Sequence, residues 1–328
     1  MALDFDQLSA TTYKNHRKQM TDNIMKKIAI LAYMQQAGKV ERKGGGTKIV
    51  EPLMYGTNTT AKSYSGRDVI DTSPQDGMTA AEYSWKNVAV TVEITEEEEN
   101  QNKGAPKLID LLKAKFDQAE KSLRLVINQM LLTDGTGNSS KDLSGLKNYI
   151  KYNYTASVSV GGIDQATHSW WRNRIAYTTA YATSGVPKMR TVFNSCTREG
   201  DQPNLLLSDQ TTFESYEDKL SNIEKIVFSK GSDLVGDMGF ISQTFKGKPF
   251  TWDSQLVADT TDYTGELGRI YFLNTDFLKL LIDPNMDFKL GEWKAPFAQR
   301  LKATQILMRG ELVCSNRQQQ GILSISGW

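Results

Sequence analysis

The chain has 328 residues, which is enough for about two domains with a sizeable core. Its 39 basic and 38 acidic residues nearly cancel, so the overall charge gives no argument for a nucleic-acid-binding or membrane protein. No apolar run approaches the ~20 residues that cross a bilayer, and Cys196 and Cys314 are too few for a disulfide framework, so we expect a protein made in the cytosol, with reduced, buried thiols and no metal or cofactor.

The chain begins with a basic segment. Residues 9–37 place apolar side chains at loose helical spacing and Gly38 ends the pattern, which predicts a modest amphipathic arm. Residues 1–48 contain nine basic and four acidic side chains, a net charge of +5. A solvated helix face explains these charges as well as an anionic surface such as DNA does. The candidates for facing DNA are Lys14, Arg17, Lys18, Lys26 and Lys27.

Two predicted strands, residues 47–55 and 82–95, enclose a polar segment. That segment, residues 56–81, is rich in Thr, Ser, Gly and Asp and has too few apolar side chains for a core of its own. We predict a long hairpin that is ordered by lying across another copy of the protein, with a flexible surface loop as the alternative. The candidate contact residues here are Lys62, Tyr64, Arg67, Asp68 and Trp85.

A run of four carboxylates, Glu96, Glu97, Glu98 and Glu99, follows the second strand. Four consecutive carboxylates cannot all converge on one substrate, so we do not predict an acid–base site here. Two interpretations stay open. The run is either solvated charge or an intersubunit salt-bridge patch opposite Lys or Arg, helped by a nearby helix N-terminus.

The longest helical pattern in the chain covers residues 106–133. Pro106 occupies the first turn, where its missing N–H costs nothing, and Gly135 follows the end. At 1.5 Å per residue this helix, which we call the spine helix, is roughly 40 Å long. Its apolar residues recur three or four positions apart and predict one buried stripe. They are Leu108, Leu112, Phe116, Ala119, Leu123, Ile127, Met130 and Leu131.

A glycine-rich connector after the spine helix predicts a domain boundary. Beyond it, Trp170 and Trp171 stand next to each other beside Arg172 and Arg174. Such a group is able to stack on bases or sugars, but core anchoring and intersubunit packing are commoner uses. We therefore take both tryptophans as candidate intersubunit contacts.

The next segment has an α/β texture. We predict a helix over residues 187–199 that begins at Pro187, a short buried strand over 205–208, and a helix over 209–220 capped by Asp209. Ser–Asp pairs occur here, but no nucleophile elbow accompanies them.

The final third is predicted to be mostly strands. Residues 238–253 form two strands around a turn at 246–248, and Pro249 suggests a position at the sheet edge. Several strands with alternating apolar positions follow, of which residues 304–313 are the longest. No linker separates them from the rest, so we expect them to pack onto the earlier parts.

The order of these parts resembles a major capsid (coat) protein of a tailed bacteriophage, in the fold shared with encapsulins and the herpesvirus capsid floor. The resemblance covers essentially the whole chain. It rests on the order and spacing of five features, each weak alone: the hairpin over 49–94, the spine helix, LLTDGTGNSSKDLSGL, FKGKPFTWDSQL and KATQILMRGELVCSNRQQQGILSIS.

This resemblance implies an α+β, L-shaped subunit with an N-terminal arm, an extended β-hairpin loop, a long spine helix in a peripheral domain and an α/β axial domain. Residues 1–46 would be the arm, 47–95 the extended loop and its base strands, 96–138 the peripheral domain with the spine helix, 139–265 the axial domain, 266–310 peripheral-domain strands, and 311–328 the return strand to the axial domain.

The resemblance also implies a function without catalysis and without a cofactor. Copies would assemble as pentamers and hexamers into an icosahedral shell around double-stranded DNA, part of the virion, assembled in the host cytoplasm. Too few residues precede the arm for a fused scaffolding segment, so the expected partners are a separate scaffolding protein, a portal and the packaged DNA, with no membrane.

Three alternatives stay open: an encapsulin-like compartment shell, a phage tail or decoration component and, from a different class, a hydrolase. The hydrolase lacks support because two histidines without paired metal ligands assemble no site.

Overall fold

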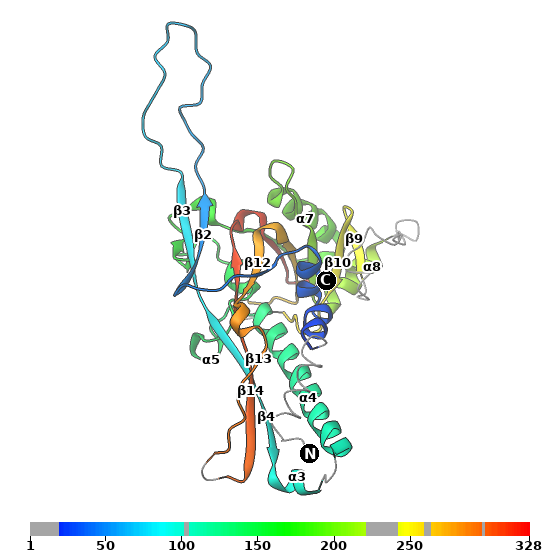
Figure 1. Cartoon of the computed structure of the whole chain (residues 1–328). Coiled ribbons are helices and arrows are strands. Elements are labelled where there is room, and N and C mark those ends of the chain that lie inside the picture. Colours follow the sequence, from blue (N-terminus) through cyan, green and yellow to red (C-terminus); the bar gives the residue numbers. More distant parts are fainter. Residues whose placement is uncertain (1–19, 102–104, 221–241, 259–263, 297–298) are drawn as a thin grey trace.

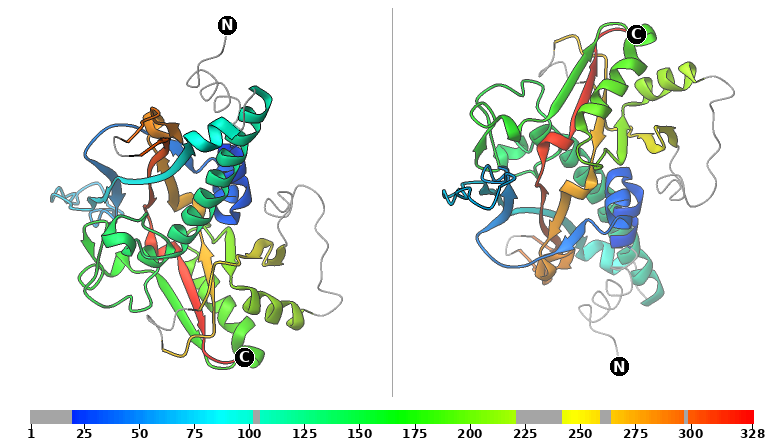
Figure 2. Two further views of the ribbon diagram at one scale, coloured as in Figure 1. Left: turned by 90° about the horizontal axis from the view of Figure 1, so that it is seen from below. Right: turned by 90° about the horizontal axis from the view of Figure 1, so that it is seen from above.

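The computed structural model describes residues 20–101, 105–220, 242–258, 264–296 and 299–328. In this part of the chain two large sheets, one long helix and one protruding hairpin make up an α+β fold, as predicted (Figure 1). In both further views the hairpin loop projects from the side of the body (Figure 2).

The first sheet is built around the longest strand, β14, Leu301–Cys314. Strand β14 contains the strand predicted over residues 304–313 and extends it at both ends. It pairs antiparallel with β4 over ten residues, from Leu301 opposite Thr95 to Gly310 opposite Lys86. The other members of this five-stranded sheet are β4 (Lys86–Thr95), β12 (Leu278–Ile282), β13 (Lys289–Leu290) and β1 (Val40–Arg42).

The second sheet has six strands in the order β7, β15, β11, β8, β10, β9. All four residues of β8, the strand predicted over 205–208, are buried. The bounds of these strands are Arg174–Thr178 for β7, Gly321–Ile325 for β15, Gly268–Leu273 for β11, Leu205–Ser208 for β8, Lys248–Trp252 for β10 and Ser242–Phe245 for β9. A separate two-stranded sheet joins β5 (Ser159–Val160) and β6 (Ile163–Asp164).

Strands β9 and β10 form the hairpin predicted around residues 246–248, although residues 238–241 lie outside the described part. The edge position inferred from Pro249 is wrong, because β10 lies between β9 and β8. Pro249 is tolerated in this interior strand because pairing with β8 starts only at the next residue, Phe250, opposite Leu206. The missing N–H therefore costs no ladder bond to β8.

The spine helix is α4, Ala105–Leu132, within one residue of its predicted ends. Where the side chains are described, its predicted stripe is buried except for Met130, which is half-buried; Leu112, Phe116 and Leu123 are no more than 2% exposed. Helix α4 packs against β4. Gly145 of the connector fits tightly against its C-terminal end, where an added Cβ would overlap the carbonyl oxygens of residues 130, 131 and 133.

The arm is buried more deeply than a modest amphipathic pattern predicts. Residues 20–27 and α2, Ala29–Gln36, are helical. Met20, Ile24 and Leu31 are fully buried in the main core cluster. The chain then adds β1 in parallel to β12. Residues 20–42 thus belong to the body of the fold, and residues 1–19 lie outside the described part.

Two predicted boundaries are wrong. The strand predicted over 82–95 divides at Trp85 into β3, Met78–Ser84, which pairs with β2, Lys48–Met54, and β4, which pairs with β14. The helix predicted from Pro187 begins earlier, as α7, Tyr181–Cys196, with Pro187 in its interior. Its N-cap, Ala180, has no side chain able to mark the start.

Other local predictions are confirmed. Asp209 caps α8, Gln210–Lys219, by accepting a hydrogen bond of 3.0 Å from the N–H of Thr212. Cys196 and Cys314 are both free and buried, and burial raises the pKa of each thiol to about 12. The domain division itself stays a prediction. Strand β11 lies beyond the predicted boundary at residue 265, yet it belongs to the six-stranded sheet.

Candidate assembly surfaces

The inner face of the β2–β3 hairpin is anchored to the body. Ile49, Leu53, Ala81 and Tyr83 are all buried. The hydroxyl of Tyr83 donates a hydrogen bond of 2.7 Å to the carbonyl oxygen of Cys314 in β14. This contact joins the hairpin base to the five-stranded sheet, so the hairpin leaves the body in a defined direction (Figure 1).

The outer face of the same hairpin is open, with apolar side chains towards its tip and a Lys48–Glu82 ion pair of 2.6 Å nearer its base. Val50 is 49% exposed, Met54 81% and Met78 76%. Met54 lies directly opposite Met78 in the ladder. Because side chains alternate along a strand, Val50 and Met54 share the face opposite Ile49 and Leu53. An apolar face of this kind marks a contact surface rather than scattered exposure.

Beyond the hairpin the chain continues as a loop without regular structure. Tyr64 is 66% exposed, Val69 87% and Ile70 57%. Its hydrogen bonds are local, as in the 2.8 Å bond from the N–H of Ser65 to the Asp68 carboxylate. The candidate residues Lys62, Tyr64, Arg67 and Asp68 are all exposed on this loop, where a partner is able to reach them.

The predicted tryptophan pair has contacts within the chain. Trp171 is buried, and its indole N–H donates a bond of 2.9 Å to the carbonyl oxygen of Val160. Trp170, in the 3-10 turn η1, Ser169–Trp171, stacks on Tyr55 with ring centroids 4.7 Å apart. Tyr55 directly follows β2, so Trp170 holds the end of the hairpin. An intersubunit role for either residue stays a prediction.

Trp85 lies where the chain passes from β3 to β4. It is half-buried, and the Arg309 guanidinium of β14 sits 5.1 Å from the centre of its ring. This cation–π contact fixes the side chain at the junction of the hairpin and the five-stranded sheet. Its predicted contact with a neighbouring subunit also stays a prediction.

Three members of the carboxylate run, Glu96, Glu98 and Glu99, have contacts within the chain. Glu98 and Thr95 form a capping box at the start of α3, Glu96–Gln101: the N–H of Thr95 donates to Glu98 and the N–H of Glu98 donates to the Thr95 hydroxyl. The Thr95 N–H and the Lys115 ammonium, 2.9 Å away, lower the pKa of Glu98.

Two more members of the run lie close to basic side chains, one in β14 and one on the residue that precedes β14. Glu99 pairs with Lys302 at 3.3 Å, and Glu96 lies 3.9 Å from Arg300. Glu96, Glu98 and Glu99 therefore each have a basic partner in the same chain. The intersubunit patch stays a prediction, and the capping box T-x-x-E is the sequence signal that we missed.

Three of the five predicted DNA-facing residues, Lys14, Arg17 and Lys18, lie outside the described residues. Lys26 forms an exposed ion pair of 3.5 Å with Asp22. Lys27 is exposed and lines a hollow of about 520 Å³ together with Arg124 of the spine helix. Within the described residues, no cluster of His, Cys, Asp and Glu is able to hold a metal, and no helix is both long and apolar enough to cross a bilayer.

The outer apolar face was not among the residues selected from the sequence, although the sequence carries a signal for it. Strand β2, KIVEPLM, has apolar residues on both of its faces, with Ile49 and Leu53 on one face and Val50 and Met54 on the other. Apolar residues on both faces are typical of a strand that is covered on both sides. Only one side is covered in the single chain.

Comparison with known proteins identifies the fold. No protein-family model and no curated protein matches the chain. Among solved structures, the capsid of cyanophage A-1(L) matches with a TM-score of 0.57 at 15% identity, covering 88% of this chain and 90% of that chain. The capsid of the native GTA particle matches with a TM-score of 0.58 at 10% identity, covering 90% of each chain.

An encapsulin is similar as well. The holo-SrpI encapsulin complex from Synechococcus elongatus PCC 7942 matches with a TM-score of 0.51 at 9% identity, covering 88% of this chain and 86% of that chain. At such identities the likeness shows the fold alone. The chain has the tailed-phage capsid fold shared with encapsulins, as its sequence predicts.

Proposed function

We propose that the chain is the structural subunit of a self-assembling icosahedral shell, built from pentamers and hexamers, in which the β2–β3 hairpin covers a neighbouring copy. The outer face of that hairpin carries the proposal. It exposes Val50, Met54 and Met78 while the inner face is anchored, so the subunit presents a firmly held apolar surface that it does not cover itself.

The physical basis of this function is buried area. A standard stable interface buries about 1,600 Å², and in this proposal the subunit adds a hairpin face and a loop to the contacts that its body makes with several neighbours. Each contact is weak alone, so the subunit stays able to correct its position during assembly. The contact free energies of all subunits add up to a large total in a closed shell.

More specifically, we propose the major capsid protein of a tailed phage, enclosing double-stranded DNA in the virion and assembled in the host cytoplasm with a separate scaffolding protein and a portal. The similar structures titled as phage and GTA capsids support this assignment. Lys27, which is exposed, and Arg124, which is half-buried, line one hollow together with the carboxylate of Asp253, and they add two cations suited to a polyanion.

An encapsulin shell is the second candidate, which the match to the SrpI encapsulin favours. The test is electron microscopy of the purified, overexpressed chain combined with a nucleic-acid assay of particles from the native source. Spherical particles support the shell, and DNA inside the native particles supports the capsid over the encapsulin. A chain that forms tubes, trimers or no particles contradicts the shell.

A further inference from the structure

Two segments of the chain run side by side through both large sheets. In the six-stranded sheet β11 pairs antiparallel with β15, from Gly268 opposite Ile325 to Phe272 opposite Gly321. In the five-stranded sheet their continuations, β12 and β14, pair antiparallel from Leu278 opposite Cys314. Together they form one two-stranded ribbon, which we call the crossing ribbon, that belongs to both sheets.

The crossing ribbon bends between the sheets. There, residues 274–277 face residues 315–320, and each segment contains a 3-10 turn: η2, Thr275–Phe277, and η4, Arg317–Gln319. The regular ladder is interrupted, and one backbone bond of 2.9 Å from the N–H of Ser315 to the carbonyl oxygen of Phe277 bridges the segments. The two sheets therefore meet where the regular ladder of the crossing ribbon is interrupted.

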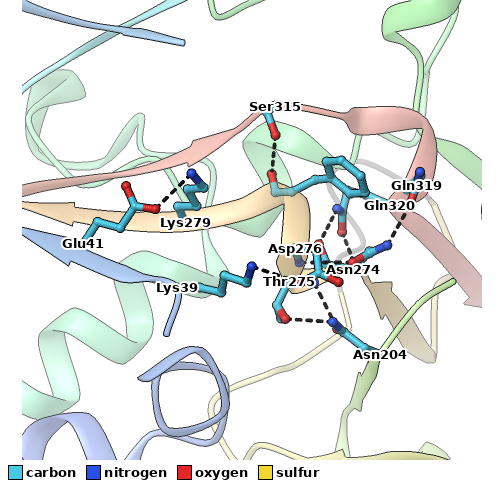
Figure 3. Close-up of polar contacts among 11 residues, drawn as sticks. Lys39, Glu41, Asn204, Asn274, Thr275, Asp276, Lys279, Ser315, Gln319 and Gln320 are labelled. Carbon is cyan, nitrogen blue, oxygen red and sulfur yellow. Dashed lines mark hydrogen bonds and ion pairs between the residues drawn. The ribbon is translucent and has the colours of Figure 1, made fainter. Parts of the chain in front are cut away.

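Gln320 closes the gap in the ladder with its side chain. Its Oε1 accepts from the N–H of Asn274 at 3.0 Å, and its Nε2 donates to the carbonyl oxygen of Asn274 at 2.9 Å (Figure 3). The amide of Gln320 thus imitates a paired strand residue. The Asn274 side chain adds a third link by donating to Gln319 Oε1 at 2.6 Å. All three residues are buried.

Arg317 holds the other side of the bend. Its guanidinium donates to the carbonyl oxygens of Tyr149 at 2.7 Å and Trp171 at 3.0 Å, and to the Gln165 amide oxygen at 3.0 Å. None of the described carboxylates lies within ion-pair distance of it, and burial lowers its pKa to about 10, so it stays charged at neutral pH. These bonds tie η4 to the segments that follow the spine helix.

A third set of contacts fixes η2. The N–H of Thr275 donates to Asn204 Oδ1 at 3.0 Å, and Asn204 Nδ2 donates to the Thr275 hydroxyl at 2.9 Å. Lys39, at the start of the segment leading into β1, forms an ion pair of 3.0 Å with Asp276 (Figure 3). The bend is thus bonded to both sheets and to the arm. The side-chain amides of Asn274, Gln319 and Gln320 all take part in these hydrogen bonds.

We propose that Gln320 is a positioning residue: its side chain, bonded to the main chain of Asn274 across the bend, fixes the angle between the two sheets. In a shell built from this subunit the same angle sets the curvature, and that second step rests on the function proposed above. Two hydrogen bonds from one side chain to the backbone fix the relative orientation of the two segments, because hydrogen bonds have preferred distances and angles. An apolar contact has no preferred direction, so it would let one segment shift along the other.

The test measures the angle in the unassembled subunit. Spin labels are placed on exposed positions of each half, Thr211→Cys on α8 and Lys289→Cys on β13, and the distance distribution is recorded by pulsed electron paramagnetic resonance. The native cysteines are buried, so the parent chain serves as the labelling control. Gln320→Leu keeps the bulk of the side chain but removes both bonds. We expect a shifted or broadened distribution.

The matched control is Gln318→Leu in the same turn, because Gln318 is also buried but its side chain donates only one bond, of 3.4 Å, to the carbonyl oxygen of Ser169. It should leave the distribution unchanged. A wild-type distribution for Gln320→Leu, or an equal change in both variants, overturns the proposal. If Gln320→Leu does not fold, Gln320→Met, which removes the same two bonds with an unbranched side chain, is judged by the same readout.

Assembled particles test the second step. If wild type forms closed particles, Gln320→Leu should give particles of altered or mixed diameter, and Gln318→Leu particles of wild-type diameter. Equal diameters for all three contradict the link from angle to curvature. If wild type forms no particles, the proposed function fails, whereas the label distances still decide the role of Gln320.

Discussion

Glu311 is a buried carboxylate whose ionisation should make subunit stability depend on pH. It lies in β14, is 1% exposed, and its Oε1 accepts from the N–H groups of Ser144 at 2.8 Å and Leu312 at 3.1 Å. Its Oε2 accepts from no group among the described residues. Burial raises the pKa of Glu311 from 4.5 to about 8, although those two N–H groups and the charge of Lys86 oppose the shift.

The sign follows from the direction of this shift. The folded chain holds the proton up to about pH 8, whereas the unfolded chain releases it near pH 4.5. The free energy of unfolding therefore falls as the pH rises between these values and is level above them. One pKa unit is worth about 1.36 kcal/mol, so the ionisation of Glu311 should lower the free energy of unfolding by up to about 3.5 kcal/mol when the pH rises from 5 to 8.

The perturbation is Glu311→Gln, assayed by denaturant unfolding of the unassembled subunit at pH 5, 6, 7 and 8. Gln keeps an acceptor for Ser144 and Leu312 but cannot ionise. Its amide N–H groups meet no acceptor, a cost of about 1–3 kcal/mol that is the same at every pH. The difference between wild type and variant should therefore change with pH by several kcal/mol, while His168 and all other groups cancel.

Glu292→Gln is the matched control, because Glu292 is exposed. Its unfolding free energy should follow that of wild type at every pH. A pH dependence in Glu311→Gln equal to that of wild type would refute the reasoning, since it would mean that Glu311 is ionised in the folded chain at pH 5. Such a result would place water or a cation at the unpartnered oxygen.

Three further predictions concern the assembly surfaces. Replacing residues 57–76 by a short Gly-Ser turn should leave a folded subunit with wild-type melting that closes no shells, because the loop contributes little to its own body; normal particles would count against the role of the loop. Met54→Ser with Met78→Ser should likewise reduce particle yield more than it changes subunit melting, because both side chains are exposed in the single chain; light scattering measures the yield, and an unchanged yield speaks against a covered face. Lys27→Gln should reduce the salt-resistant DNA retention of particles more than Lys26→Gln, because Lys26 is already paired with Asp22; equal retention for both variants would remove the DNA-facing assignment.

Elements whose signals are local could be predicted from the sequence. The spine helix carries an apolar stripe and marks at both ends, and it was placed to within one residue. Asp209 was identified as a cap because its role depends only on the next three residues. The long β14 and the buried β8 follow from alternation and apolar content alone.

Features that depend on distant partners could not be placed. The predicted strand 82–95 divides at Trp85 because its first part pairs with β2 and its second part pairs with β14. Both partners lie elsewhere in the sequence, so the residues around Trp85 do not indicate the division. For Glu98 the sequence left solvated charge and an intersubunit salt bridge open, whereas its partner Lys115 lies 17 positions further along the same chain. Arg317, which joins four segments through neutral oxygens, has no local signature at all.

The central claim is that the apolar outer face of the β2–β3 hairpin is completed by another copy of the chain. A cryo-electron microscopy map of assembled particles tests it most directly. We predict density for a neighbouring subunit against Val50, Met54 and Met78. A map in which this face points into solvent, or in which the hairpin folds back onto its own subunit, would contradict the account.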